Sequence, residues 1–346
     1  MATEGNADHI STGREPPASP ESGARPPGGR SRQVLVGAVI GVAALAAVSA
    51  LAAVGAFNGN ASALTNCAAA PSRCGFPDAT NTGVPAGTTL KSVPAQVSSG
   101  TGWAYSTTGG DVIVTGNGAV LSGLYIPHEL LIKASSVTIK DVQVAAAGDF
   151  GIALTHTKGV TIENSTISGQ NATVGRIGSA IDDEYGDSTG IIIKANNISD
   201  FRTAIQISAG LVDANYVHDP GYISGDHTNG FYTNGGTGAL TIENNTIFES
   251  LNETDAINLD AGSAGSAVAN KTVENNFLAG GAYTIYGGTS PNNPTSKIVI
   301  KGNRFGQQYH ALSGQYGPIA YFNPASSGNS WSGNIWDTTG KTIPAP

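Results

Sequence analysis

Each of two aspartates stands five residues before an apolar residue, and this shared spacing suggests a catalytic pair. Asp200 lies five residues before Ile205, and Asp226 lies five residues before Phe231. If the two apolar residues stack on neighbouring strands, the two carboxylates lie about 5 Å apart. A retaining glycosidase uses carboxylates about 5 to 5.5 Å apart, whereas two stacking steps, roughly 9 to 10 Å, approach the spacing of an inverting enzyme. The pair could instead hold Ca²⁺, which binds several oxygen ligands.

A histidine and an arginine extend the set of candidate catalytic groups. His227 follows Asp226, and a neighbouring carboxylate fixes the tautomer of a histidine and raises its basicity. The alternative is that His227 only holds its own loop in shape. A polysaccharide lyase needs a cation that stabilises an enolate and a base that removes a proton, roles that suit Arg202, His227 and Tyr232. The candidate acids, bases, metal ligands and charge stabiliser are Asp182, Asp200, Arg202, Asp226, His227 and Asp255.

A repeated motif determines how these residues are positioned. A small residue precedes an apolar residue, an outward position and a second inward position, as in Ala204-Ile205-Gln206-Ile207. The leading apolar residues are separated by 29, 24, 26, 26 and 28 residues, which indicates a repeat with variable insertions. They are Ile152, Ile181, Ile205, Phe231, Ile257 and Ile285.

A second motif lies between the copies of the first, as in TIENNTI (241–247). Its polar position forms the column Ser165, Asn196, Asn215, Asn245, Asn276 and Asn303. Asn tolerates the left-handed backbone of a tight corner, and stacked amides hydrogen-bond along a column. Three short strands per turn, stacked in parallel, predict an all-β, right-handed parallel β-helix.

Alternation along the first strand of each turn predicts which side chains face outward. The outward column is expected to be Ala153, Asp182, Gln206, Tyr232, Asn258 and Thr284. A polar strip with one aromatic ring has the composition of a sugar-binding face, although outward positions are also polar simply because they meet water. The predicted substrate contacts are Gln206, Asn229, Tyr232 and Asn258.

The two motifs, written gI-x-l and tI-x-NN-x-I, resemble the repeat of the right-handed parallel β-helix proteins of the pectin-lyase-like superfamily, from about Val112 to Ile335. The resemblance implies a groove on the outer face of the first strand, walled by the loops before it. It leaves the activity open, because that superfamily includes lyases, hydrolases, epimerases and adhesins. The motifs of the best-known pectate lyases and polygalacturonases are not matched. The segment 74–90 resembles one found ahead of such coils in secreted actinobacterial proteins.

The composition fits a solenoid and argues against a nucleic-acid partner. Gly accounts for 47 of 346 residues, and only 12% of residues are charged, which suits short strands joined by tight corners. The net charge of −8 lacks the excess of Lys and Arg that binding to nucleic acid requires.

The amino end predicts export. Residues 1–33 are expected to be disordered and cytoplasmic, and residues 34–57 are long and apolar enough to be a transmembrane anchor. The same segment could instead be the core of a signal peptide that is cut after Ala63. Residues 58–110 are expected to form a linker and cap, with a disulfide between Cys67 and Cys74, and residues 111–346 the β-helix.

Together these patterns predict a secreted or membrane-anchored protein that cleaves a polysaccharide as a lyase or as a glycoside hydrolase. The alternative is a non-catalytic glycan-binding or structural protein of the cell surface. Calcium is the one cofactor that the acidic residues suggest, and the sequence does not require it.

Overall fold

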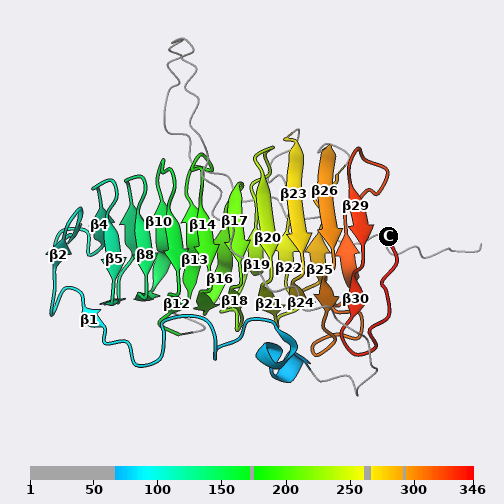
Figure 1. The fold of residues 1–346 in the computed structure, drawn as a ribbon, viewed down its shortest axis with the longest axis horizontal. Helices are drawn as coiled ribbons and strands as arrows, with labels where there is room; N and C mark the ends of the chain where they lie inside the picture. Colours follow the sequence, from blue (N-terminus) through cyan, green and yellow to red (C-terminus); the bar gives the residue numbers. More distant parts are fainter. Residues whose placement is uncertain (1–66, 172–174, 261–265, 291–293) are drawn as a thin grey trace, which may run out of the picture. The chain divides into compact units, whose positions relative to one another are not determined.

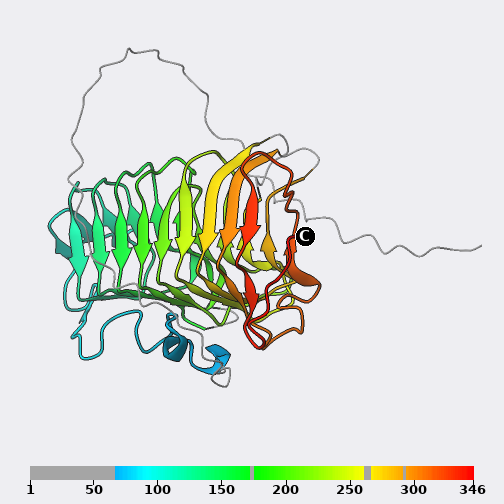
Figure 2. The ribbon, with the colours of Figure 1, turned by 45° about the vertical axis from the view of Figure 1, so that its right-hand side comes forward.

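The computed structural model describes residues 67–171, 175–260, 266–290 and 294–346, and strands dominate them. Two short 3-10 helices, η1 (Cys67–Ala69) and η2 (Pro71–Cys74), begin this part of the chain. The strands of the described residues form sheets of 10, 11 and 9 strands, which we call sheets A, B and C. The chain passes from sheet B to sheet C to sheet A and back to sheet B, turn after turn (Figures 1 and 2). The predicted all-β parallel β-helix is confirmed.

Within each sheet, strands that are neighbours in space come from successive turns of the chain. Sheet A contains β1 (Lys91–Ser92), β6 (Leu124–Ile126), β9 (Gln143–Ala146), β12 (Thr166–Gly169), β15 (Asn197–Ser199), β18 (Tyr216–Val217), β21 (Thr246–Glu249), β24 (Phe277–Gly280), β27 (Arg304–Phe305) and β30 (Ile335–Trp336). Sheet B contains β2 (Ser99–Gly100), β3 (Trp103–Tyr105), β4 (Val112–Val114), β7 (Leu130–Ile132), β10 (Gly148–Leu154), β13 (Ile177–Asp183), β16 (Phe201–Gln206), β19 (Asn229–Tyr232), β22 (Asp255–Asn258), β25 (Tyr283–Tyr286) and β28 (Gly317–Ala320). Sheet C contains β29 (Ser330–Ser332), β26 (Thr295–Lys301), β23 (Val268–Glu274), β20 (Leu240–Glu243), β17 (Gly210–Asp213), β14 (Ile192–Lys194), β11 (Thr161–Glu163), β8 (Thr138–Lys140) and β5 (Val120–Ser122).

The register of sheet B is the one that the sequence repeat predicts. The leading apolar residues pair from strand to strand, and each of them is fully buried. The paired column consists of Ile152, Ile181, Ile205, Phe231, Ile257 and Ile285. A one-residue slip would move a whole strand's apolar set out of the core, so burial of this column sets the register.

The corner between sheets C and A holds the predicted ladder of asparagines, and each of its members is fully buried. Asn215 is representative: its Oδ1 accepts hydrogen bonds from the backbone N–H and the Nδ2 of Asn196, both at 3.0 Å. The ladder runs through Ser165, Asn196, Asn215, Asn245, Asn276, Asn303 and Asn334. Each amide therefore forms hydrogen bonds with backbone groups of the preceding turn. Buried backbone groups at a corner need such partners.

Both ends of the coil carry additional structure. In sheet B, β2 pairs antiparallel with β3, and β3 pairs antiparallel with β4, so a hairpin covers the first parallel strand. At the other end, Trp331 Nε1 donates a hydrogen bond to the carbonyl of Ile343, and Ile343 is buried. These segments protect the terminal edges from pairing with other chains.

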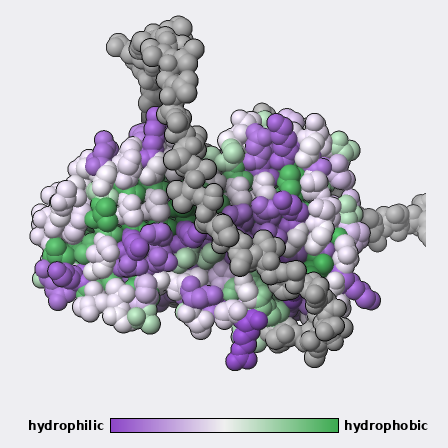
Figure 3. Space-filling view, in the orientation of Figure 1, coloured by the Kyte–Doolittle hydropathy of each residue, from purple (hydrophilic) through white to green (hydrophobic). Residues whose placement is uncertain are grey.

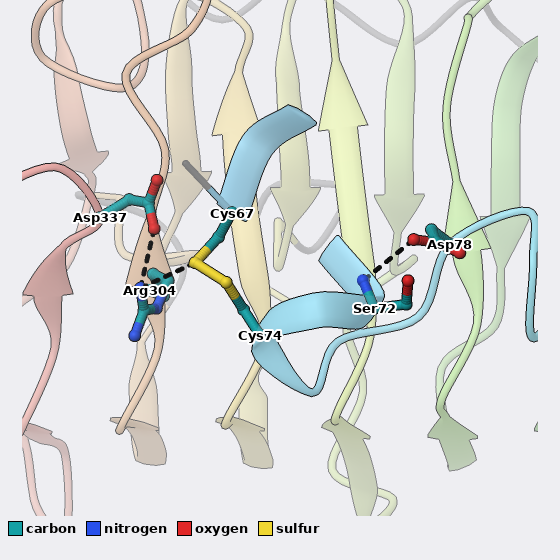
Figure 4. The surroundings of a disulfide bond; sticks show 6 residues. All are labelled: Cys67, Ser72, Cys74, Asp78, Arg304 and Asp337. Carbon is teal, nitrogen blue, oxygen red and sulfur yellow. Dashed lines mark hydrogen bonds and ion pairs between the residues drawn. A yellow bond between two sulfur atoms is a disulfide. The ribbon is translucent and has the colours of Figure 1, made fainter. Parts of the chain in front are cut away.

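A segment that we call the strap, residues 67–90, follows sheet A from the last coils to the first (Figures 1 and 2). Its start is held by the predicted disulfide between Cys67 and Cys74, which is confirmed (Figure 4). Arg304 of β27 donates hydrogen bonds to Cys67 Sγ and to Asp337 Oδ1, at 3.3 and 2.9 Å. Farther along, the N–H of Gly83 donates to the carbonyl of Ala195 at 3.0 Å.

The face of the molecule in Figure 3 mixes hydrophilic and hydrophobic residues in small patches. Among the described residues, no helix has the length and apolar character needed to cross a membrane. The predicted disordered segment 1–33 and the predicted anchor or signal segment 34–57 lie outside the described residues.

Candidate functional site

The strands of sheet B direct two successive residues into the core. In β22, Ala256 and Ile257 are both fully buried within the hydrophobic core. In β19, a Cβ built on Gly230 would lie 2.4 Å from Cγ2 of the core residue Ile247. The alternation of inward and outward side chains is therefore broken once in each strand. The residue before the inward pair and the residue after it both face outward.

The outer face of sheet B consequently carries two columns of side chains, which we call the outer columns. The first consists of the residues two positions before the leading apolar residue: Phe150, Ser179, Thr203, Asn229, Asp255 and Tyr283. The second consists of the residues one position after it: Ala153, Asp182, Gln206, Tyr232, Asn258 and Tyr286.

The single outward column predicted from alternation is thus corrected in two ways. It did not include the first outer column, although Asn229 and Asp255 of that column were predicted as site residues, and it placed Thr284 where Tyr286 stands. Thr284 is fully buried, and its Oγ1 donates a hydrogen bond to Ser313 Oγ at 2.9 Å. Ala153 keeps its place in the second outer column, where it is fully buried.

Asp255 lies in the first outer column, on β22, and is fully buried. Its Oδ2 accepts a hydrogen bond from Asn258 Nδ2 at 2.9 Å, and its buried Oδ1 has no hydrogen-bond partner in the structure. Burial raises the pKa of Asp255 well above its ordinary value, and repulsion from Glu249 and Asp260 adds to the rise. The site therefore favours the protonated, uncharged form of this carboxyl group.

Asn258 connects the Asp255 carboxyl group to the backbone of Asp260 rather than offering a free amide to a ligand. Its Nδ2 donates to Asp255, and its Oδ1 accepts a hydrogen bond from the backbone N–H of Asp260 at 2.8 Å. Asn258 is 7% exposed, so both ends of its amide are used within the protein. The predicted substrate contact at Asn258 is better described as a positioning residue for Asp255.

A second buried carboxyl group, Glu249, stands at the end of β21 in sheet A. Its Oε1 accepts hydrogen bonds from Thr228 Oγ1 and from the N–H of Leu251, at 3.1 and 3.2 Å, and its Oε2 has no partner in the structure. Burial raises the pKa of Glu249 to about 8. Sequence reasoning missed Glu249, although it stands two residues after the inward-facing Ile247, where strand alternation predicts an inward acid.

Two tyrosines flank Asn258 in the second outer column. Tyr232 pairs with Asn258 on one side, and Tyr286 pairs with it on the other. Both side chains are half-buried. Burial, with nearby Asp260 and Asp255, raises the pKa of Tyr232 to about 12. The phenols therefore stay neutral and present both an aromatic face and a hydroxyl group.

The structure gives the predicted partners Asp200 and Asp226 different surroundings. Both carboxylate oxygens of Asp226 accept hydrogen bonds from Arg176, at 2.6 Å each. Asp200 stands at a corner with φ of 55°, and burial raises the pKa of its carboxyl, with repulsion from Asp219 adding to the rise. The charge of Asp226 is thus balanced by Arg176, which the repeat pattern does not identify as its partner.

The remaining predicted residues lie around the outer columns. Asp182 is buried in the second column, next to half-buried Gln206. Asn229 is buried in the first column, and its Nδ2 donates to the carbonyl of His227 at 3.1 Å. Arg202 and His227 are exposed. The structure therefore gathers Asn229, Tyr232, Asp255 and Asn258 on adjacent strands and leaves the predicted cation and base at the solvent side.

An exposed histidine at the other end of sheet B was also missed. His156 Nδ1 lies 2.6 Å from Asp187 Oδ2, and its ring stacks on Tyr185 with centroids 4.4 Å apart. The three residues belong to the loops that follow β10 and β13. They come together because the two loops stack, and the sequence carries a signal of it, since His156 and Tyr185 each stand four residues after the paired leading residues Ile152 and Ile181.

The acidic residues of the site raise the question of metal binding. Across the residues that the structure describes, no group of three or more His, Cys, Asp and Glu side chains is arranged to hold a metal ion. In this structure Asp226, one of the two ligands suggested for calcium, bonds to Arg176 instead.

The comparison with protein families agrees with the architecture. The family model described as "Right handed beta helix region" matches residues 128–316, more than half of the chain. The chain therefore belongs to this family of right-handed β-helix proteins. No curated protein and no solved structure matches the chain.

Proposed function

We propose that this protein is an exported carbohydrate-active protein that binds a polysaccharide along the outer face of sheet B. The observation that carries the proposal is the register of the second outer column, in which Gln206, Tyr232 and Tyr286 are half-buried. Neighbouring strands are about 4.8 Å apart, so an extended glycan chain lying across them would meet the amide of Gln206 and the phenols of Tyr232 and Tyr286. Amides and phenols supply the hydrogen bonds and ring faces that sugars need.

Hydrolytic cleavage is a second candidate function, which the environment of Asp255 favours. A carboxylic acid whose pKa is raised by burial can act as a general acid. In the proposed step, Asp255 gives its proton to the glycosidic oxygen while the bond from that oxygen to the anomeric carbon breaks. Water adds to the anomeric carbon and gives its proton to the Asp260 carboxylate. Because Asp255 is fully covered, the step requires that the side chains above it move when the glycan binds.

A lyase is less well supported than a hydrolase. Abstraction of a proton next to a uronate carboxylate needs a cation beside that carboxylate. None of the twelve positions of the outer columns that we define is Lys or Arg. Arg176, which stands close before β13, has its guanidinium group bound to Asp226.

The proposal is tested with the full chain on a panel of polysaccharides. Binding is measured by affinity electrophoresis, hydrolysis by new reducing ends, and lyase action by the ultraviolet absorbance of unsaturated products. Asp255→Asn should abolish any hydrolysis, by roughly 100-fold or more, and leave binding intact. Asp213→Asn, on the outer side of sheet C, is the matched control. Absence of binding to every polysaccharide would refute the proposal, and binding without products would leave only the binding function.

The cellular location forms part of the same proposal. We place the coil outside the cell, either anchored by residues 34–57 or released after Ala63. Fractionation of the producing cells and amino-terminal sequencing of the mature chain would separate these two forms. Recovery of the protein in the cytoplasm would exclude both.

A further inference from the structure

The last coils of sheet B carry a group of four tyrosines that the proposed catalytic residues do not use. Tyr283 and Tyr286 belong to β25, and their ring centroids are 5.6 Å apart. Tyr316, just before β28, lies 5.8 Å from Tyr283, and Tyr321, just after β28, stacks on Tyr286 at 5.4 Å. We call these four residues the tyrosine platform.

The tyrosine platform is open to solvent at its two ends. The relative exposure of Tyr316 is 52% and that of Tyr321 is 36%, whereas Tyr283 and Tyr286 are half-buried. The two exposed rings flank β28 on both sides, so they border the outer face rather than fill the core. Rings that only filled the interior of the coil would be buried, as Phe231 is.

The accessible part of the outer columns carries no charge. Only two of the twelve residues are carboxylic acids, Asp182 and Asp255, and both are buried. The half-buried members that a ligand can reach include Gln206, Tyr232, Tyr283 and Tyr286, all of them neutral. A polyanionic chain would find no cation in these columns, and a polycationic chain would find no exposed carboxylate in them.

We propose that the polysaccharide bound on sheet B is a neutral glycan and that the tyrosine platform holds it by stacking against its sugar rings. The carbon-bound hydrogens of a pyranose ring form an apolar face, which packs on an aromatic ring, while the hydroxyl groups at its edge bond to phenols and amides. This inference rests on the proposed function, since it names the class of glycan bound at the same face.

The test compares neutral and charged soluble polymers as probes for the full chain. The neutral probes are a β-glucan, a xylan and a galactomannan, and the charged probes are polygalacturonate and chitosan. We expect binding to at least one neutral probe that changes little when salt is raised, because no ion pair is involved. Binding to a charged probe alone, with strong salt dependence, would overturn the inference.

Substitutions then test whether the tyrosine platform contacts the neutral glycan. Replacing Tyr316 and Tyr321 together by Ala should weaken binding to the neutral probe roughly tenfold, since each ring contributes a modest stacking energy. Tyr185→Ala is the matched control, because Tyr185 is 51% exposed and stacks on a ring, but it lies in the loop after β13, five strands away from β28 in sheet B. Equal binding by the platform variant and the control would overturn the inference.

The two sets of variants separate this inference from the proposed cleavage. If Asp255→Asn binds the neutral probe as the parent does and the parent releases no products, the platform stands and the hydrolase candidate falls. If the parent cleaves polygalacturonate and the platform variant is unaffected, carbohydrate activity stands and the neutral-glycan inference falls. Circular dichroism of each variant shows whether the coil remains folded.

Discussion

Arg176 and Asp226 are joined by two hydrogen bonds of 2.6 Å, Nε to Oδ2 and Nη2 to Oδ1, although 50 residues separate them. Arg176 directly precedes β13 and Asp226 lies in the loop before β19, and β16 stands between these two strands in sheet B. The ion pair therefore ties the inserted loop 218–229 to a strand beyond its immediate neighbour. Ile223, within this loop, donates its N–H to the same carboxylate at 2.8 Å.

Asp226→Asn should destabilise the protein because it leaves the mostly buried Arg176 without a counter-charge. The side chains of Arg176 and Asp226 are only 14% and 9% exposed. Breaking a buried pair typically costs about 3 to 5 kcal/mol, and we expect a fall in the free energy of unfolding of about 3 kcal/mol. Denaturant titration measures the fall, and limited proteolysis should show faster cleavage within 218–229.

The matched control for that substitution is Glu163→Gln. Glu163 pairs with Lys140 at 3.6 Å on the more exposed face of sheet C, with side chains 29% and 46% exposed. An exposed pair contributes less than about 1 kcal/mol. Similar losses from Asp226→Asn and Glu163→Gln would show that the loop is not held by its ion pair.

Much of the fold was predictable because a solenoid repeats its local rules. The burial of Ile205 and the ladder amide of Asn215 follow from short-range patterns that recur in every turn. The site was less predictable, since the small residue before each leading apolar residue breaks the alternation. The recurrence of Ala204, Gly230 and Ala256 at that position is the signal that two successive residues face the core. The ion pair between Asp226 and Arg176 could not be predicted from the sequence, because the conformation of a loop outside the repeat brings the two residues together.

The buried carboxyl of Glu249 should make the protein less stable as pH rises. Its pKa is raised from an ordinary value of 4.5 to about 8, so the folded chain keeps a proton that the unfolded chain releases. Over that window the folded state binds more protons, and the free energy of unfolding falls by about 1.4 kcal/mol per pH unit for one such group. Thermal unfolding between pH 4.5 and 8 measures this slope.

Glu249→Gln isolates the contribution of this residue. Gln retains an acceptor for Thr228 and does not ionise, so the downward slope should shrink by about the amount that one proton contributes. The pKa of Asp255 is also raised, so Glu249→Gln should still lose stability as pH rises. Adding Asp255→Asn should remove this remaining slope. A slope unchanged in both variants would mean that neither carboxyl stays protonated in the folded protein.

The asparagine ladder should be far more sensitive to substitution than the corner residue next to it. Asn245 Nδ2 donates to the carbonyls of Val212 and Glu243, and its Oδ1 accepts from Asn215. Asn245→Ala would leave several buried backbone groups unsatisfied, which we expect to cost about 3 kcal/mol in the free energy of unfolding.

Asn244 is the control, because it is exposed and adopts φ of 55°, a left-handed conformation that Gly adopts readily. Asn244→Gly should change the free energy of unfolding by less than about 1 kcal/mol. A large loss at Asn244 and a small one at Asn245 would reverse the roles assigned to the corner and the ladder.

Reduction of the disulfide should loosen the strap locally and leave the coil folded. Cys67 and Cys74 close a loop with a sequence separation of 7, and a loop of this size contributes about 2 kcal/mol. The strap also contacts the coil through Phe76, whose ring lies 5.3 Å from that of Phe277. Hydrogen exchange should therefore rise within residues 67–84 after reduction, while the amides of sheets A, B and C keep their protection. Exchange that rises across the sheets would mean that the disulfide supports the whole coil.

Lys271 should give a pH dependence of the opposite sign to that of Glu249. Its Nζ is buried and donates to the carbonyls of Ser208 and Gly238, at 2.6 and 2.9 Å, and burial lowers its pKa from 10.5 to about 8. Between these two values the unfolded chain binds the proton that the folded chain releases, so stability should rise with pH by about 1.4 kcal/mol per unit. Lys271→Met should remove the rise, whereas Lys194→Met, at a side chain that is 51% exposed, should keep it. A rise that persists in Lys271→Met would show that the ammonium group remains charged inside the coil, held by the two carbonyls.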